Sequence, residues 1–130
     1  THVVAVSGGK MVFVSGQVAL DEHGNLVGKG DLREQTKQAF ENLKRGLTAA
    51  GARFEDVVKM TYYVVGYRPE QLPAIREGRS EYLSRTNPPA VDVLPPFGDL
   101  RGTVAFSLAG ASPTCSAQGL VSLAATELAR

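Results

Sequence analysis

The sequence has few of the residues that cross-link a chain or bind a metal ion. It contains one cysteine, Cys115, two histidines and no tryptophan among its 130 residues. A single cysteine cannot form an internal disulfide, so a reducing, cytoplasmic environment is expected. The two histidines, His2 and His23, are too few and too far from Cys115 in sequence to suggest a zinc-type ligand set.

The sequence also lacks an excess of charge and long apolar runs. Fourteen Lys and Arg residues oppose 13 Asp and Glu residues, so the formal net charge is +1. This balance argues against a nucleic-acid or membrane-surface partner. No apolar run approaches the ~20 residues of a membrane-spanning helix, and the first residues do not resemble a signal peptide. With 43% hydrophobic and 21% charged residues, the chain is expected to form one folded domain over residues 1–130.

The first half of the chain predicts two strands and a helix. Strands are expected over residues 2–7 and 10–19, and Gly8-Gly9 between them is typical of a two-residue hairpin turn. Met11 and Phe13 should point to one side of the second strand, with Val12, Val14 and Val18 on the other. A helix is predicted over 31–50, with Asp31 and Glu34 resembling a capping box and Gly51 just past the end.

The second half predicts three more strands and one more helix. Strands are expected over 57–65, 91–94 and 103–109, and a helix that begins near Pro69 is expected to run to about Leu83. The order β-β-α-β-α-β-β favours an α+β fold, with one mixed sheet and two helices on one face. Two helices cover only one face, yet the second and third strands are apolar on both faces. Either a second subunit covers the other face, or this is the apolar surface that any protein exposes.

Several motifs, in this order and spacing, resemble those of the Rid family, also called YjgF-like. They are residues 12–18 (VFVSGQV), 35–47 (beginning QTKQAFENL), 49–51 (AAG), 56–61 (DVVKMT) and 87–90 (NPPA). The resemblance covers residues 10–90. It implies the chorismate-mutase-like fold and a homotrimer with three pockets at the subunit interfaces. It also implies hydrolysis, without a cofactor or metal, of imines and enamines such as 2-aminoacrylate to keto acids and ammonia.

Only one pocket element of the family carries over to this sequence. The resemblance implies that Ser15, Gly16 and Gln17 bind the substrate; on residue type alone, they are also compatible with a strand end and a bulge. Deaminase-type members have an arginine after the Pro-Ala pair, where this chain has Val91. Their last strand carries glutamates, and the matching stretch 104–108 (VAFSL) has no acid. The tyrosine found early in many members has no counterpart here.

Two charged residues are weaker candidates for the missing groups. Arg101 could replace the arginine from a nearby loop, and Asp92 could orient water; each is also compatible with an ordinary solvated side chain. The break in the pattern coincides with a change in composition. Residues 1–90 contain 22 charged residues and residues 91–130 contain 5. A genuine divergence, a shifted reading frame or an error in the recorded sequence would each account for it.

Three functional hypotheses follow, from different classes. The first is a cofactor-independent imine or enamine deaminase, or a degenerate descendant of one, with no catalytic residue assigned. The second is a non-catalytic homotrimer that binds a small imine or carboxylate metabolite or a protein. The third is the ribonuclease or translation initiation inhibitor activity attached to the names of some family members, which the near-neutral charge does not favour.

Overall fold

The computed structural model describes residue 5 and residues 7–86, 88–94, 103–110 and 119–126. Within these residues the chain forms five strands, two α-helices and two short 3-10 helices. The strands are β1 (Phe13–Val14), β2 (Lys59–Tyr63), β3 (Ala90–Leu94), β4 (Thr103–Gly110) and β5 (Gly119–Thr126). The helices are α1 (Leu32–Ala49), η1 (Phe54–Asp56), η2 (Pro69–Gln71) and α2 (Leu72–Gly78).

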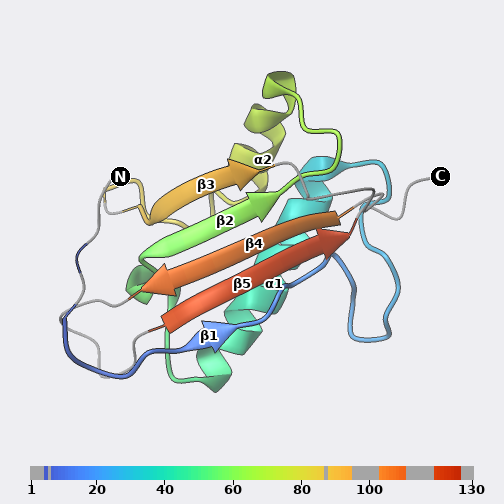
Figure 1. The fold of residues 1–130 in the computed structure, drawn as a ribbon. Coiled ribbons are helices and arrows are strands. Elements are labelled where there is room, and N and C mark those ends of the chain that lie inside the picture. The colour runs from blue at the N-terminus through green and yellow to red at the C-terminus, as the bar shows by residue number, and fades with distance from the viewer. Residues whose placement is uncertain (1–4, 6, 87, 95–102, 111–118, 127–130) are drawn as a thin grey trace.

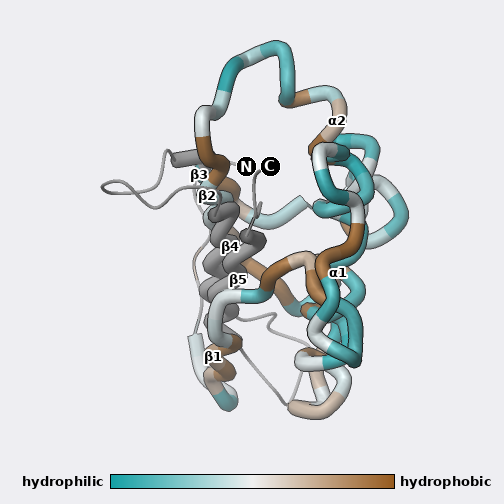
Figure 2. The backbone as a smooth tube through the Cα atoms, turned by 90° about the vertical axis from the view of Figure 1, so that its right-hand side faces the viewer, coloured by the Kyte–Doolittle hydropathy of each residue, from teal (hydrophilic) through white to brown (hydrophobic). Residues whose placement is uncertain are grey.

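The strands form a single mixed sheet in the order β1-β5-β4-β2-β3. The outer pairs, β1 with β5 and β2 with β3, are parallel, whereas β4 is antiparallel to both of its neighbours. Both α-helices lie behind the sheet in Figure 1, and the side view separates a sheet layer from a helix layer (Figure 2). The α+β class predicted from the sequence is therefore confirmed, and both helices lie on one face. None of the helices in the described residues is long and apolar enough to span a membrane.

Helix α1 forms where its sequence predicts. The Asp31 carboxylate accepts hydrogen bonds from the backbone N–H groups of Arg33 and Glu34, at 3.0 and 3.1 Å, which caps the helix. Gly51 follows the helix with a φ of 76°, a conformation that favours glycine. The second half of the predicted capping box is wrong, because Glu34 pairs with Arg33 while the Asp31 N–H donates to the carbonyl of Gly28.

Strand β1 is shorter than the predicted strand over 10–19, because the chain leaves the sheet after Val14. Backbone carbonyls beyond this point bond to side chains of α1 instead of a strand. Asn42 Nδ2 donates to the carbonyls of Val18 and Leu20, at 2.9 and 2.8 Å, and Gln38 Nε2 also donates to Leu20. Gly8 and Gly9 do have the positive φ values that a hairpin turn requires, 74 and 78°. Most of the strand predicted before them lies outside the described residues.

Helix α2 ends at Gly78, five residues before the predicted end at Leu83. Beyond it the chain continues as turns, in which the N–H of Tyr82 donates to the carbonyl of Arg79. These turns bring the Tyr82 ring to 5.3 Å from that of Phe40, measured between centroids. The tertiary contact of a large aromatic ring thus outweighs local helix propensity here.

Strand β5 was not expected, so the order β-α-β-α-β-β-β in the described residues differs from the predicted one. Its sequence, GLVSLAAT, contains one Gly and two Ala residues, which are depleted in strands. Eight residue pairs join it to β4, from Thr103 with Thr126 to Gly110 with Gly119. The pairing partner, rather than local composition, therefore determines this strand.

The hydrophobic core lies between the sheet and the two helices. Phe40 and Leu43 of α1, Met60 and Tyr62 of β2 and Ile75 of α2 are all fully buried. The buried positions of α1 agree with a helical spacing, and Met60 and Tyr62 lie on the same side of β2. Around Phe40, the rings of Phe54 and Tyr82 complete an aromatic cluster.

Candidate functional site

The predicted substrate-binding segment follows β1 directly. Ser15 and Gly16 are exposed and Gln17 is half-buried. The Gln17 side-chain amide donates to the backbone carbonyl of Ser15 at 3.1 Å, which holds the segment in a tight local turn. Its backbone therefore faces solvent at the β1 edge of the sheet, where a ligand or another copy of the chain can reach it.

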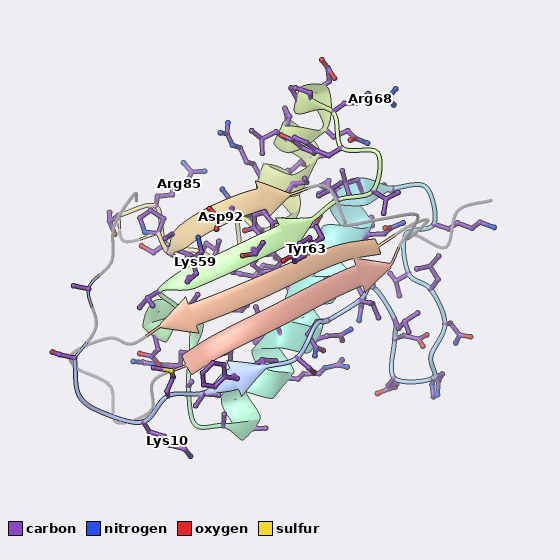
Figure 3. All side chains as sticks on the ribbon, in the orientation of Figure 1. Lys10, Lys59, Tyr63, Arg68, Arg85 and Asp92 are labelled. Carbon is purple, nitrogen blue, oxygen red and sulfur yellow. The ribbon has the colours of Figure 1, made fainter. Side chains whose placement is uncertain are left out.

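Asp92 lies at the other edge of the same sheet, in β3. Figure 3 shows it beside Lys59 on the face of the sheet that no helix covers, and the two side chains form an ion pair. Arg101 lies outside the described residues. Strands β1 and β3 are separated by four strand-to-strand steps of about 4.8 Å, or roughly 19 Å. One chain therefore does not bring Ser15, Gly16 and Gln17 together with Asp92.

A cavity of about 610 Å³ lies at the β3 edge, between the end of α2 and the start of β3. Arg76 of α2, Arg79 at its end and Arg85 of the following loop contribute its charged groups. Ser80 and Ser84 add hydroxyl groups, and the apolar lining comes from Leu83, Pro88, Pro89 and Val91. Val91, the residue that stands where the resemblance implies an arginine, is thus a wall of an arginine-lined cavity. We call it the arginine cavity.

Arg79 is held in place by a buried tyrosine. Its Nη1 donates to the hydroxyl of Tyr62 at 2.7 Å, and its guanidinium carbon lies 5.5 Å from the centre of the Tyr62 ring. Burial raises the pKa of Tyr62 to about 12, although the neighbouring Arg79 charge opposes part of this rise. The phenol therefore stays neutral at physiological pH, and its hydrogen bond occupies only one of the five guanidinium donors of Arg79.

No carboxylate lines the arginine cavity within the described part of the chain. None of the ion pairs found there involves Arg76, Arg79 or Arg85 either. Three guanidinium groups with no acid among them raise the local positive potential, so the cavity is complementary to an anion. A carboxylate or phosphate can accept two parallel hydrogen bonds from one guanidinium.

Sequence reasoning did not identify these arginines as a site. Arg76 and Arg79 are three residues apart, a spacing that places two side chains on the same helix face, and this was the available signal. Arg85 joins them only because α2 ends early.

As for metals, the described residues contain no group of three or more His, Cys, Asp or Glu side chains suited to an ion.

The uncovered side of β1 is strongly apolar. Met11 and Phe13 are 59% and 63% exposed, whereas Val12 is buried and Val14 packs against the core. The predicted alternation along this strand is therefore confirmed. Large exposed apolar side chains of this kind are typical of a surface that contacts another molecule.

The family to which the chain belongs follows from its sequence and fold together. The family model described as endoribonuclease L-PSP matches residues 1–93, and the chain is a member of this family, the Rid family. A RutC family protein of Pyrococcus abyssi is 38% identical over 89 residues, which cover 68% of each chain. A 2-iminobutanoate/2-iminopropanoate deaminase of Dermatophagoides farinae is 32% identical over 84 residues, 65% of this chain and 64% of the relative.

A solved structure confirms the fold class. A Rid family protein of unknown function from Yersinia pestis is 35% identical, with a TM-score of 0.64 over 75% of each chain. The resemblance read from the motifs over residues 10–90 is therefore confirmed at the level of family and α+β fold. The match of the family model ends at residue 93, close to the point where the sequence motifs end.

Proposed function

We propose that this protein hydrolyses small imines or enamines that carry a carboxylate group. The observation that carries the proposal is the arginine cavity beside Val91. Membership of the Rid family supports the reaction class, as does the deaminase name of one relative. In this proposal the cation that binds the substrate comes from α2 and the loop after it rather than from β3.

The proposed reaction is a hydrolysis that proceeds through a carbinolamine. Water adds to the imine carbon, and the resulting carbinolamine loses ammonia as its hydroxyl becomes the carbonyl of the keto acid. An enamine first takes a proton on carbon to become the imine. The arginines would bind the substrate carboxylate in two-point contacts, and so hold the reacting carbon at a fixed distance from Arg76 and Arg79.

The complete site would need two copies of the chain. Ser15, Gly16 and Gln17 lie at the β1 edge and the arginine cavity lies at the β3 edge, on opposite sides of the sheet. We therefore propose that the Ser15–Gln17 segment of one copy meets the arginine cavity of the next, in a homotrimer. Exposure of Met11 and Phe13 beside the segment supports an interface at this edge.

The decisive experiment measures turnover of an imine generated in place. An amino-acid oxidase would generate the imine in the presence of semicarbazide. Semicarbazide traps the imine that has not been hydrolysed, and the amount of trapped product would be recorded against time. Arg76→Gln and Arg85→Gln should each lower kcat/KM by about 10- to 100-fold, the value of one charge-assisted hydrogen bond. Arg68→Gln is the matched control, because Arg68 is exposed and lies outside the cavity. Equal activity in all three variants would show that the cavity does not bind the substrate.

A second function is favoured by one observation. The described residues that line the arginine cavity include no carboxylate or histidine to move a proton. A homotrimer that binds a small carboxylate without converting it is therefore the alternative. In that case the wild-type protein would bind pyruvate, as seen by calorimetry, and Arg76→Gln would weaken this binding. Imine decay would then match the protein-free rate.

A further inference from the structure

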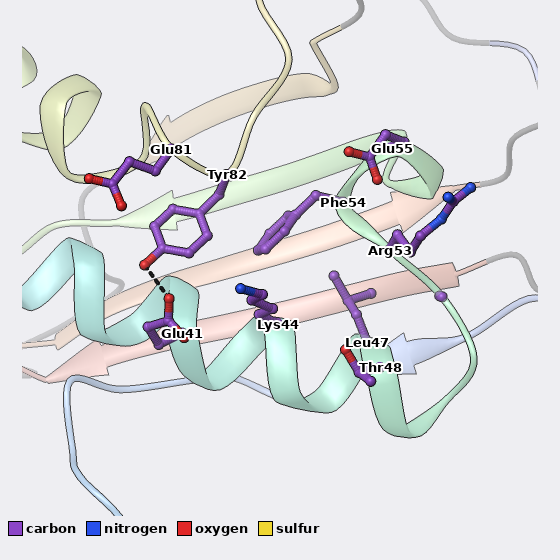
Figure 4. A pocket seen from close by; sticks show the side chains of 10 residues that line it. Glu41, Lys44, Leu47, Thr48, Arg53, Phe54, Glu55, Glu81 and Tyr82 are labelled. Atoms are coloured by element: carbon purple, nitrogen blue, oxygen red, sulfur yellow. Dashed lines mark hydrogen bonds between the residues drawn. The ribbon is translucent and has the colours of Figure 1, made fainter.

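A second cavity, of about 330 Å³, lies on the helix side of the molecule. It is bounded by α1, by the segment from Ala52 to Glu55 and by the turn that carries Tyr82 (Figure 4). Its volume is at the lower end of the range for small-molecule pockets, so it suits a ligand of modest size. None of the three arginines of the proposed substrate site lines it.

The interior of this cavity is apolar and aromatic. Leu47 and Ala52, which are almost fully buried, lie at its base. The rings of Phe54 and Tyr82 form its wall, with centroids 5.5 Å apart and planes inclined by 59°. The buried Phe40 ring, which does not line the cavity, already stacks on Phe54 and contacts Tyr82, so a ligand ring can stack only on the sides of Phe54 and Tyr82 that face the cavity.

The rim of the cavity carries charges of both signs. Two of its three acids are already engaged: the Tyr82 hydroxyl donates to Glu41 Oε1 at 2.6 Å, and Glu81 Oε1 lies 3.9 Å from Lys37 Nζ. Burial, Glu41 and Glu81 all raise the pKa of Tyr82, so its phenol remains a donor at physiological pH. The hydrogen bond from Tyr82 therefore holds the Glu41 side chain in place on the rim of the cavity.

The remaining charged groups on the rim are Lys44, Arg53 and Glu55. None of the three takes part in an ion pair within the described portion of the chain. Figure 4 shows Lys44 next to the aromatic wall, between Glu41 and Phe54. A ligand with charge of one sign only would satisfy some of these groups and be repelled by the others.

We propose that this cavity binds a small zwitterion with a flat apolar side chain, the chemistry of an aromatic amino acid. The ring would lie against the sides of Phe54 and Tyr82 that face the cavity, over Leu47. The carboxylate would pair with Lys44. The ammonium group would pair with Glu55, the rim acid that is not already engaged within the described residues. The site is separate from the proposed deaminase site, and its test does not depend on imine turnover.

The experiment titrates the folded protein with three probes and follows backbone amide shifts by NMR. L-Phenylalanine carries the ring and both charges, 3-phenylpropionate lacks the ammonium group, and phenethylamine lacks the carboxylate. Phenylalanine should bind at millimolar concentration and shift amides of Lys44, Thr48, Phe54 and Tyr82. Each of the other probes should bind about tenfold more weakly, as expected for one lost charge-assisted bond.

Two variants assign the binding to this cavity. Lys44→Gln should weaken phenylalanine binding about tenfold and leave phenethylamine binding unchanged. Arg45→Gln, which removes one positive charge from the next residue of the same helix, is the matched control and should change neither, since Arg45 does not line the cavity. The proposal is overturned if phenylalanine shifts amides elsewhere or none at all. Equal effects of the two variants, or equal binding of the three probes, would also overturn it.

Discussion

Replacement of Gly78 by alanine tests the closest approach between the two helices. Gly78 is buried at the end of α2, against α1. A Cβ atom at this position would lie 2.6 Å from the backbone oxygen of Arg33 and 2.9 Å from Cβ of Thr36. Both distances are shorter than carbon and oxygen atoms tolerate, and the nearest atom belongs to a helix backbone that cannot rotate away.

The expected size of the effect combines two opposing terms. Alanine favours a helix over glycine by up to about 1 kcal/mol. Forcing a methyl group into a packed contact costs about 1–3 kcal/mol, because the helices must separate or shift. Since the clash at Gly78 is with backbone, the second term should dominate, and Gly78→Ala should lower the free energy of unfolding by about 1–2 kcal/mol.

Gly46 provides the matched control. It lies inside α1, and a Cβ there would meet only the Cγ1 methyl of Val14, at 3.3 Å. A side chain can give way by this amount, so Gly46→Ala should leave the stability unchanged or raise it by up to about 1 kcal/mol. Urea unfolding followed by far-UV circular dichroism measures both variants. A Gly78→Ala protein as stable as the wild type would refute the helix packing described above.

Three further predictions concern the helix cap and two perturbed side chains. Asp31→Ala should lower the free energy of unfolding by about 1 kcal/mol in urea, because two backbone N–H groups lose their acceptor. Backbone and side-chain hydrogen bonds from Asn25 lower the pKa of Asp21. An NMR titration should therefore place the pKa of Asp21 below its ordinary value of 3.8, and Asn25→Ala should raise it. The lowered pKa stabilises the turn above the unfolded pKa, and this support is lost as pH falls through the folded pKa. Because burial raises the pKa of Tyr62 to about 12, its support for folding is complete below the ordinary value near 10 and is lost as pH rises to 12. Ultraviolet titration should show the same number of tyrosines ionising near pH 10 in the wild type and in Tyr62→Phe, and the wild type should lose stability as pH rises from 10 to 12. One more tyrosine ionising near pH 10 in the wild type than in the variant would contradict this.

Local signals allowed α1 and β2 to be predicted closely. The cap at Asp31, the helical spacing of buried residues and Gly51 all act within a few residues, so they can be read in the sequence. The strand over 57–65 was also predicted, because the alternation that buries Met60 and Tyr62 is a property of the strand itself.

The features that were missed depend on contacts distant in sequence. β1 ends early because side chains of α1 bind the carbonyls of Val18 and Leu20. β5 exists through its pairing with β4 rather than through its own composition. The arginine cavity requires α2 to end at Gly78, so that Arg85 turns back toward Arg76. Motifs suggested Ser15, Gly16 and Gln17 as substrate-binding residues, which stays a prediction, and no motif indicated where the chain places its cations.

The placement of β1 and β3 at opposite edges of the sheet has a genetic consequence. Under the proposed function, each polypeptide carries two unlike half-sites, and each working site joins halves from two polypeptides. A mutant defective at Ser15 and a mutant defective at Arg76 would then each be inactive alone. When the two mutants are coexpressed, some sites would combine an intact Ser15 half from one polypeptide with an intact Arg76 half from the other. Two such alleles are therefore expected to complement each other within a single gene.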